Sequence, residues 1–172
     1  GLLWRPLEAD LRLKTVITEK YGASFIPGDM TLQDYPFTYS EMEPYFDKFE
    51  RICGASGQAG NLNGERIDGG NPFEAQRANP FPTKPLLYQY SAMLFEKTAK
   101  EMGYNPFPGP AAICTEAYTN PYGVALGVCN YCGFCEKFGC YNYSKASPQT
   151  TIIPALRQYD NFELRCKSHV LR

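Results

Sequence analysis

The 172-residue sequence lacks an excess of charge of either sign. Its formal net charge is −1, and charged residues make up 20% of the chain. Proteins that bind nucleic acids or anionic membranes usually carry a basic patch, so neither class of partner is expected. No apolar run approaches the roughly 18 residues that a membrane-spanning helix needs. The first residues do not combine a basic head with a continuous apolar stretch, so they do not read as a secretory signal.

Groups that commonly carry out catalysis or bind nucleotides are scarce. His169 is the single histidine, and a structural role is expected for it before a catalytic one. No Gly-x-Gly-x-x-Gly motif follows a candidate strand, so the usual phosphate-binding turn of a dinucleotide domain is missing. We therefore predict no catalytic residue within this chain.

The two ends do not have the polar, tapering composition that is typical of termini. The sequence opens on GLLWRP and closes on FELRCKSHVLR, which reads as a strand cut at its last residue. We expect the chain to be an excerpt from a longer polypeptide.

The residues that are present indicate a loop-rich α+β fold with two or three helices and few strands. The chain has 15 glycines and 14 prolines, while aromatic residues reach 15%, so many turns are expected. A first helix is predicted over 40–53, with Ser40 and Glu43 as a capping box and Gly54 as its end. Residues 54–85 show no sustained period and predict a long ordered loop, which in a compact domain usually has a function or covers something.

Three further elements follow. A second helix is predicted over 87–102, ahead of Gly103. A third begins at Ser147, and Pro154 interrupts it. Alternating apolar and charged residues over 162–167 predict a half-buried strand.

Four cysteines gather in the stretch VCNYCGFCEKFGC: Cys129, Cys132, Cys135 and Cys140. Their spacing is C-x2-C-x2-C-x4-C. Thiols three residues apart can wrap a loop around a compact inorganic core, as in bacterial ferredoxins. An iron–sulfur cluster is therefore the preferred interpretation.

Two alternatives stay open. Structural zinc usually takes two separated pairs of ligands, because a tetrahedral ion needs them from opposite sides. Disulfides within a C-x2-C motif are strained and more often catalytic than structural.

The fourth cysteine departs from the ferredoxin pattern. That pattern ends with a gap of three residues and a proline, whereas here the gap is four residues and Tyr141 follows Cys140. If Cys140 is a ligand, a [4Fe–4S] cluster is expected. If it is not, a [3Fe–4S] cluster is plausible. The other three cysteines, Cys53, Cys114 and Cys166, are expected to be buried and structural.

Several stretches resemble the glucose–methanol–choline (GMC) family of flavin oxidoreductases. SKASPQTTIIPALRQYDNFELRCKSHVLR is similar to a segment with a Ser-capped helix, a Pro-Ala-Leu turn and an Asn-Phe-x-Leu strand. GLLWRP resembles a flavin-contacting stretch, and YPFTYSEMEPYFDKFERICGASG resembles the helix that follows it. The cysteine loop most resembles that of flavoprotein subunits of bacterial membrane-linked sugar and sugar-acid dehydrogenases, a branch with an iron–sulfur cluster.

The resemblance implies an organisation of the chain. Residues 1–53 would be a flavin-flanking segment and helix, and 54–128 a long loop plus helix of the substrate domain. Residues 129–140 would form the cysteine loop, and 141–172 a helix and strand that return to the FAD domain.

The resemblance also implies roles for residues. Val170 resembles the valine whose backbone contacts the adenine end of FAD, and Gly1 and Leu3 resemble positions beside the isoalloxazine. The four clustered cysteines resemble the cluster ligands. The catalytic histidine of the family and its partner lie in the C-terminal third, which is expected outside this chain, so the chain alone is expected to be inactive.

The function implied for the longer protein is FAD-dependent oxidation of a hydroxyl group on an alcohol, sugar, polyol or sugar acid. Electrons would pass from the flavin through the cluster to a cytochrome or quinone. A cytochrome subunit, a small partner subunit and the remainder of the polypeptide are the expected partners, at a periplasmic or membrane-associated location. The alternatives are a zinc-stabilised interaction module without redox activity and a self-contained ferredoxin-like carrier.

Overall fold

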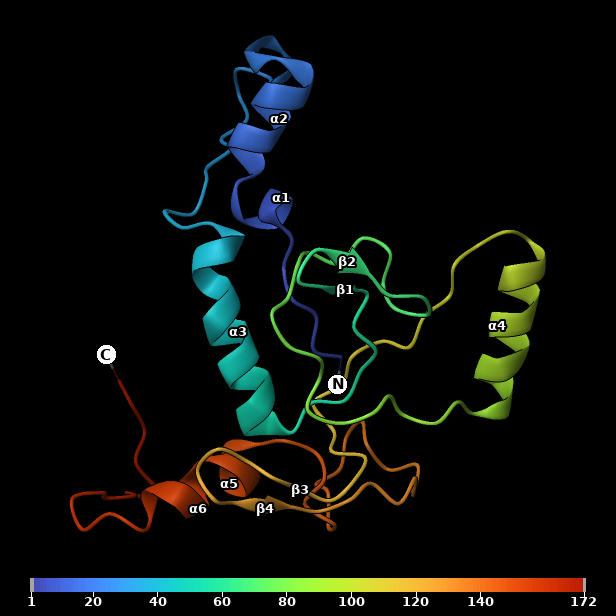
Figure 1. Ribbon diagram of the computed structural model, residues 1–172. Helices are drawn as coiled ribbons and strands as arrows, with labels where there is room; N and C mark the ends of the chain where they lie inside the picture. The colour runs from blue at the N-terminus through green and yellow to red at the C-terminus, as the bar shows by residue number, and fades with distance from the viewer. Residues whose placement is uncertain (1, 172) are drawn as a thin grey trace.

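The computed structural model describes residues 2–171, and its mixed α and β elements are compatible with the predicted class (Figure 1). In chain order the elements are α1 (Glu8–Leu11), α2 (Leu13–Tyr21), the 3₁₀ turn η1 (Ala23–Phe25), α3 (Tyr39–Cys53), β1 (Asn61–Leu62), β2 (Glu65–Arg66), α4 (Tyr90–Glu101), β3 (Tyr118–Thr119), β4 (Ala125–Leu126), α5 (Pro148–Thr151) and α6 (Ile153–Leu156). The strands form two separate antiparallel pairs, β1 with β2 and β3 with β4.

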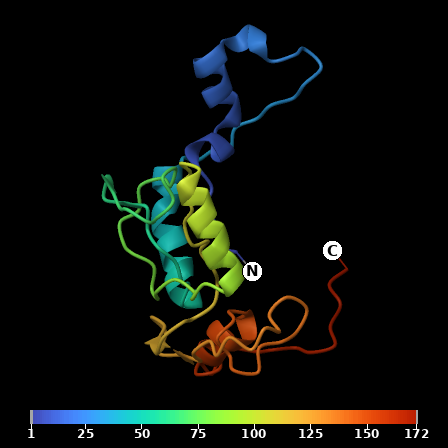
Figure 2. The same cartoon turned by 90° about the vertical axis from the view of Figure 1, so that its right-hand side faces the viewer.

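The described residues contain six α-helices, more than the two or three predicted. Two of the additional helices, α1 and α2, form an arm that projects from the body (Figures 1 and 2). Leu13, Val16, Ile17 and Tyr21 lie at helical spacing, a signal that the sequence analysis did not use. No residue of α2 is buried. The helix predicted from Ser147 begins as expected, and it is interrupted as expected. The break lies at Ile152, however, and Pro154 is in the first turn of α6.

Helix α3 begins one residue earlier than predicted, with a different cap. Thr38 is the N-cap: its hydroxyl accepts the Glu41 amide at 3.4 Å, and its own amide donates to the Glu41 carboxylate at 2.7 Å. The predicted box of Ser40 and Glu43 is wrong, and Glu43 instead pairs with Arg5 at 2.9 Å. The predicted end is confirmed, because Gly54 adopts the left-handed conformation (φ 59°, ψ 41°).

The segment after α3 is the best-buried part of the molecule, although the sequence predicted a long loop there. Ala55 and Ser56 are almost fully buried. The Ser56 amide donates to Ala111 O at 2.8 Å, and the Gly57 amide to Thr83 O at 3.2 Å. Short extended pieces from three parts of the chain therefore meet here. They are too brief to show a period in the sequence.

The same region contains the β1–β2 hairpin, which the sequence analysis did not predict. Asn63 and Gly64 both have positive φ, at 52° and 92°. Asn-Gly is the common two-residue turn of a hairpin. Each strand is only two residues long, which is too short for alternation to be visible.

Beside this core lies a buried network of charges. Glu50 accepts two hydrogen bonds from Arg5, at 2.8 and 2.9 Å, and a further one from Arg77. Arg77 is fully buried and also pairs with Glu74 at 3.0 Å. Its guanidinium lies 3.7 Å from the centre of the Phe81 ring. The network joins the N-terminal segment, α3 and the segment after it.

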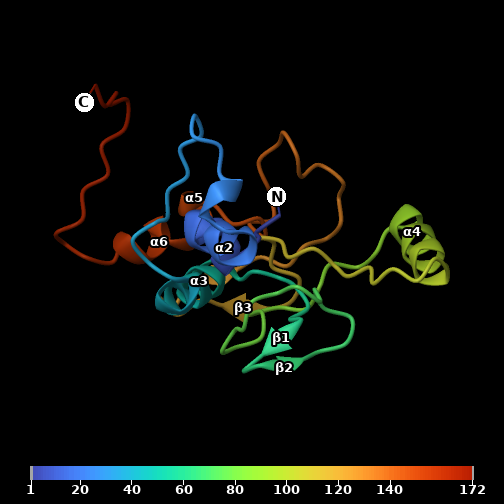
Figure 3. The same ribbon diagram turned by 90° about the horizontal axis from the view of Figure 1, so that it is seen from above.

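Helix α4 stands apart from the rest of the fold in Figures 1 and 3. It begins three residues later than predicted, while Gly103 follows its end with φ +81°, as expected. The apolar side chains that predicted the helix are largely exposed, including Tyr90 at 72% and Phe95 at 70%. The helix forms as its sequence period predicts, but nothing in the described residues covers its apolar face.

The predicted half-buried strand over 162–167 is wrong for the structure. These residues form neither helix nor strand, and most of them are exposed. Alternation describes a strand only when a neighbouring strand pairs with it, and the described residues offer none. Cys166 is consequently exposed rather than buried, and His169 is also exposed.

The chain exposes far more surface than a self-contained domain of its size. Its accessible surface is 12231 Å², whereas a compact monomer of 19.4 kDa would expose about 8,500 Å². No helix in the described part of the chain has the length and apolar character needed to cross a bilayer.

Candidate metal centre: the cysteine loop

The cysteine loop, residues 129–140, starts shortly after β4 and ends before α5. Its approach and exit are both fixed to residues 112–114. The Cys129 amide donates to Cys114 O at 2.9 Å, and the Cys114 amide donates to Ser144 O at 2.8 Å. The Ala146 amide donates to Ala112 O at 2.9 Å. The base of the loop is therefore held in place, while the loop itself forms an open excursion (orange in Figure 3).

The four thiols are distributed between the base and the outer part of the loop. Cys129 and Cys140 are half-buried, whereas Cys132 and Cys135 are exposed. All seven cysteines are free thiols, so the disulfide alternative is not formed. Within residues 2–171 no three His, Cys, Asp or Glu side chains lie close enough together to hold a metal ion. The structure therefore does not bring the four predicted ligands into one site.

The donor set still has the chemistry that an iron–sulfur cluster or a zinc ion requires. Its four thiols have no disulfide partner, and thiolates are the ligands of both kinds of centre. No helix or strand lies within 129–140, so closing the loop around a centre would break no ladder of backbone hydrogen bonds. Four cysteines are the right type and number of ligands for such a group, but the loop does not bring their sulfur atoms together.

Cys140 is the cysteine whose surroundings most favour a thiolate. Burial alone would raise its pKa. A hydrogen bond with the Ser144 hydroxyl, at 3.3 Å, and hydrogen bonds from nearby backbone amides outweigh burial and lower the pKa to about 7. Because the thiolate is the form that binds metals, this environment suits a ligand. It supports a role for Cys140, the position at which the sequence departs from the ferredoxin pattern.

Cys53 and Cys114 are buried, as predicted for structural thiols. Burial raises the pKa of Cys53 to about 11 and also raises that of Cys114. Both therefore favour the neutral thiol at physiological pH.

Two residues that the sequence analysis did not single out shape the loop. Ser144 contacts the Cys140 thiol, and Lys145 donates hydrogen bonds to Cys135 O and Phe138 O. Their only signal in the sequence is their position shortly after the last cysteine.

The three predicted flavin contacts lie in different settings. Gly1 is outside the described residues. The Leu3 amide donates to Pro110 O at 2.9 Å, and its side chain lines an apolar cavity of about 370 Å³ together with Phe49, Ile52 and Ala146. Val170 is 83% exposed, in the extended segment near the C-terminal end. Their roles toward flavin remain predictions.

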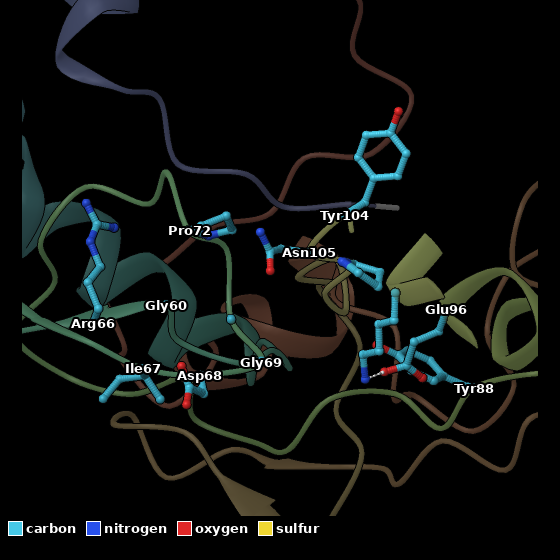
Figure 4. A pocket seen from close by; sticks show the side chains of 13 residues that line it. Gly60, Arg66, Ile67, Asp68, Gly69, Pro72, Tyr88, Glu96, Tyr104 and Asn105 are labelled. Carbon is cyan, nitrogen blue, oxygen red and sulfur yellow. Dashed lines mark hydrogen bonds and ion pairs between the residues drawn. The ribbon is translucent and has the colours of Figure 1, made fainter. Parts of the chain in front are cut away.

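A second candidate site is a mixed polar and apolar cavity of about 410 Å³ beside α4 (Figure 4). Tyr88 and Tyr104 contribute rings to it, and Asp68 contributes a carboxylate. Lys100 and Glu96 form an ion pair of 2.7 Å, drawn as a dashed line in Figure 4. The cavity therefore offers charged groups, hydrogen-bonding groups and aromatic rings.

Comparison with known proteins identifies relatives along the whole chain. No protein-family model matches it. The gluconate 2-dehydrogenase flavoprotein of Pantoea cypripedii is 43% identical over 175 residues that cover 100% of the chain. The fructose dehydrogenase large subunit of Gluconobacter japonicus is 30% identical over 67% of the chain, and paromamine 6'-oxidase of Streptomyces fradiae is 25% identical over 80%.

The chain belongs to the GMC-type flavin oxidoreductases. The family resemblance inferred from the sequence is thus confirmed. The chain spans 28%, 18% and 21% of the lengths of these three GMC relatives. The internal boundaries predicted for the GMC segment, at 53, 128 and 140, remain predictions.

Proposed function

We propose that this chain is part of an FAD-dependent dehydrogenase that oxidises a hydroxyl group of a sugar, polyol or sugar acid. The observation that carries the proposal is the 43% identity, along the whole chain, to a protein named gluconate 2-dehydrogenase flavoprotein. The second relative is also named for the dehydrogenation of a sugar, fructose. The catalytic base and the dinucleotide-phosphate site would lie in the remainder of the polypeptide.

Flavin, when bound, would accept a hydride from the carbinol carbon of the substrate. This chain would contribute Gly1 and Leu3 beside the isoalloxazine and Val170 at the adenine end. Arg5 supports this arrangement because its double hydrogen bond to Glu50 fixes the N-terminal segment against α3. Leu3 is thereby held two residues from a buried anchor.

We further propose that Cys129, Cys132, Cys135 and Cys140 hold an iron–sulfur cluster, either [3Fe–4S] or [4Fe–4S]. The spacing, the free thiols and the thiolate-favouring surroundings of Cys140 support this assignment. Such a cluster, when bound, would supply a one-electron path between a two-electron flavin and a one-electron acceptor. The acceptor would be a cytochrome subunit or a quinone, at a periplasmic or membrane-associated location, with a small partner subunit in the complex.

The flavin-dependent activity is tested on the full-length protein. Anaerobic addition of gluconate or fructose should bleach the flavin absorbance, and an artificial electron acceptor should restore it over repeated turnovers. A full-length protein that carries no flavin, or whose flavin absorbance none of a panel of sugars, polyols and sugar acids changes, would contradict the proposal.

The cluster is tested by iron and sulfide analysis of anaerobically purified full-length protein, with EPR during a redox titration. Cys132→Ser should lower the iron content, and Cys140→Ser should convert a [4Fe–4S] signal into a [3Fe–4S] signal or lower the iron content. Cys166→Ser is the matched control, because Cys166 is an exposed free thiol outside the loop. It should leave the iron content unchanged.

Zinc ligation is the competing assignment for the same four thiols. Zinc thiolates lack the broad absorbance near 400 nm that iron–sulfur centres show, so the colour of the protein separates the two (a general property of the ligand sets). A protein with one zinc per chain and no iron would support the interaction module instead.

A further inference from the structure

We propose that Lys145 is a positioning residue of the cysteine loop, which fixes the path of the chain between the third and fourth cysteines. It would also place a positive charge among the proposed metal ligands. The proposal concerns the same loop as the proposed iron–sulfur cluster, and its effect on the cluster rests on that proposed function.

The geometry is a two-point clamp on the backbone. The Lys145 ammonium donates to Cys135 O and to Phe138 O, each at 2.6 Å. The chain turns over residues 135–137, which brings these two carbonyls to one ammonium. Hydrogen bonds from a charged donor are about twice as strong as neutral ones. They are therefore well suited to hold a loop that has no helix or strand of its own.

The clamp starts from a fixed base. Lys145 forms an antiparallel bridge with Ile113, within the pairing of 112–114 with 144–146 that anchors the loop. Its side chain reaches back from this base into the loop. The charge is therefore tied to the part of the molecule that also fixes Cys129 and the Cys140–Ser144 contact.

The charge itself has a consequence for a bound centre. No carboxylate pairs with Lys145 among the described residues; its partners there are backbone carbonyls. Metal-bound cysteines are thiolates, so a filled loop would accumulate negative charge beside this ammonium. Charge and hydrogen bonding around a cluster set its reduction potential, and a nearby cation stabilises the more negative, reduced state.

The same loop provides a matched control. Lys137 carries the same charge between the same two cysteines, and it is exposed. Lys137→Met removes a positive charge from the loop without removing the clamp. Lys145→Met removes both, and Lys145→Arg keeps the charge and part of the hydrogen bonding.

The first experiment measures hydrogen exchange in the metal-free full-length protein. Lys145→Met should speed exchange of the Cys129 and Tyr143 amides, which are hydrogen-bonded to Cys114 O and Cys140 O at the two ends of the loop, by roughly tenfold or more, the effect of losing one or two charged hydrogen bonds. Lys145→Arg should show a smaller effect, and Lys137→Met should show none. Unchanged exchange in Lys145→Met, or equal acceleration in Lys137→Met, would overturn the clamp. If the methionine variant does not fold, Lys145→Gln is judged by the same criteria.

The second experiment measures iron per protein and midpoint potential after reconstitution. Lys145→Met should give a lower midpoint potential at equal iron content, and Lys145→Arg should restore most of the potential. A potential equal to that of the wild type would overturn the electrostatic part. If the wild-type protein binds zinc or no iron, the proposed cluster is contradicted. The exchange experiment needs no metal, so it still tests the clamp in that case.

Discussion

The buried side chains of Arg5, Glu50 and Arg77 are held together by charge. Glu50 is 2% exposed, and two arginines converge on it from segments far apart in the sequence. Burial by itself would lower the pKa of Arg5, but the hydrogen bond and charge of Glu50 outweigh burial and raise it. Such a group stabilises the fold only while every partner is present, because an unpaired buried charge is costly.

Glu50→Gln should therefore destabilise the protein severely. Two buried guanidinium groups would lose their shared counter-charge, and the free energy of unfolding should fall by about 3–5 kcal/mol. Urea unfolding of the full-length protein measures the change. The control is Glu163→Gln, which breaks an exposed ion pair with Arg165 and should leave the free energy of unfolding nearly unchanged, because exposed ion pairs contribute little to stability. Similar losses in both variants would show that the network does not depend on Glu50.

Cys140 should be reactive near neutral pH in the metal-free protein. Its pKa is about 7, and because the thiolate is the nucleophile, its alkylation rate should rise with pH and reach half its maximum near that value. Iodoacetamide labelling of this peptide over a pH series, read by mass spectrometry, measures the profile. In Ser144→Ala one hydrogen bond to the sulfur is lost, so the pKa should rise and the midpoint should move to higher pH. An unmoved midpoint would show that Ser144 does not stabilise the thiolate.

At the scale of secondary structure, the ends of the helices depend on local residues, whereas the burial of their faces depends on tertiary packing. Helix α3 ends where its glycine predicts, because a left-handed C-cap is a local requirement of the backbone. Helix α4 forms where its apolar period predicts, yet that apolar face is exposed. Capping depends on neighbours in sequence, whereas burial of a face depends on what packs against it.

Gly54→Ala should destabilise the end of α3 for two reasons. The residue has φ +59°, and a Cβ atom there would lie 2.7 Å from Leu126 Cδ1 and 3.1 Å from Tyr118 Cδ1. We expect a loss of about 2–4 kcal/mol in urea unfolding, from backbone strain and overpacking together. Gly103→Ala is the matched control, since φ is +81° but no atom lies within 4 Å of the new Cβ. It should cost about 1 kcal/mol, and an equal loss at both sites would exclude the packing contribution.

At the scale of the whole molecule, the chain has the surface of an incomplete unit. Its 12231 Å² of accessible surface exceeds the roughly 8,500 Å² of a compact monomer of this mass. Large apolar side chains on α4 are exposed. Phe73, Phe95 and Met102 line an apolar cavity of about 760 Å³ beside this helix. Contiguous apolar surface of this kind is usually covered by another part of the protein or by a partner.

The excised 172-residue chain should therefore bind the hydrophobic dye ANS strongly, and the full-length protein should bind much less per mole. Replacing Leu94 and Phe95 together by glutamate should reduce dye binding to the excised chain, because both side chains lie on the exposed face of α4. Fluorescence titration measures the difference. Weak dye binding by the excised chain would show that its apolar surface is covered within the chain itself.

Much of the local organisation could be read from the sequence. The cysteine spacing, the Gly54 end of α3, the Ser147 start of α5 and the family all depend on residues close together in the chain or on a pattern of such stretches. A cap, a turn or a ligand spacing involves only a few neighbouring residues. The residues that determine such a feature are therefore visible together in the sequence.

Long-range contacts left no such trace. Arg5, Glu50 and Arg77 are separated by 45 and 27 positions, and no local pattern indicates that they share one buried network. The burial of residues 55–61, the exposure of the 162–167 segment and the reach of Lys145 into the cysteine loop were likewise settled by which segments meet in space. Burial and hydrogen bonding between distant segments depend on the folded arrangement of the whole chain, and residue order close to each site does not encode it.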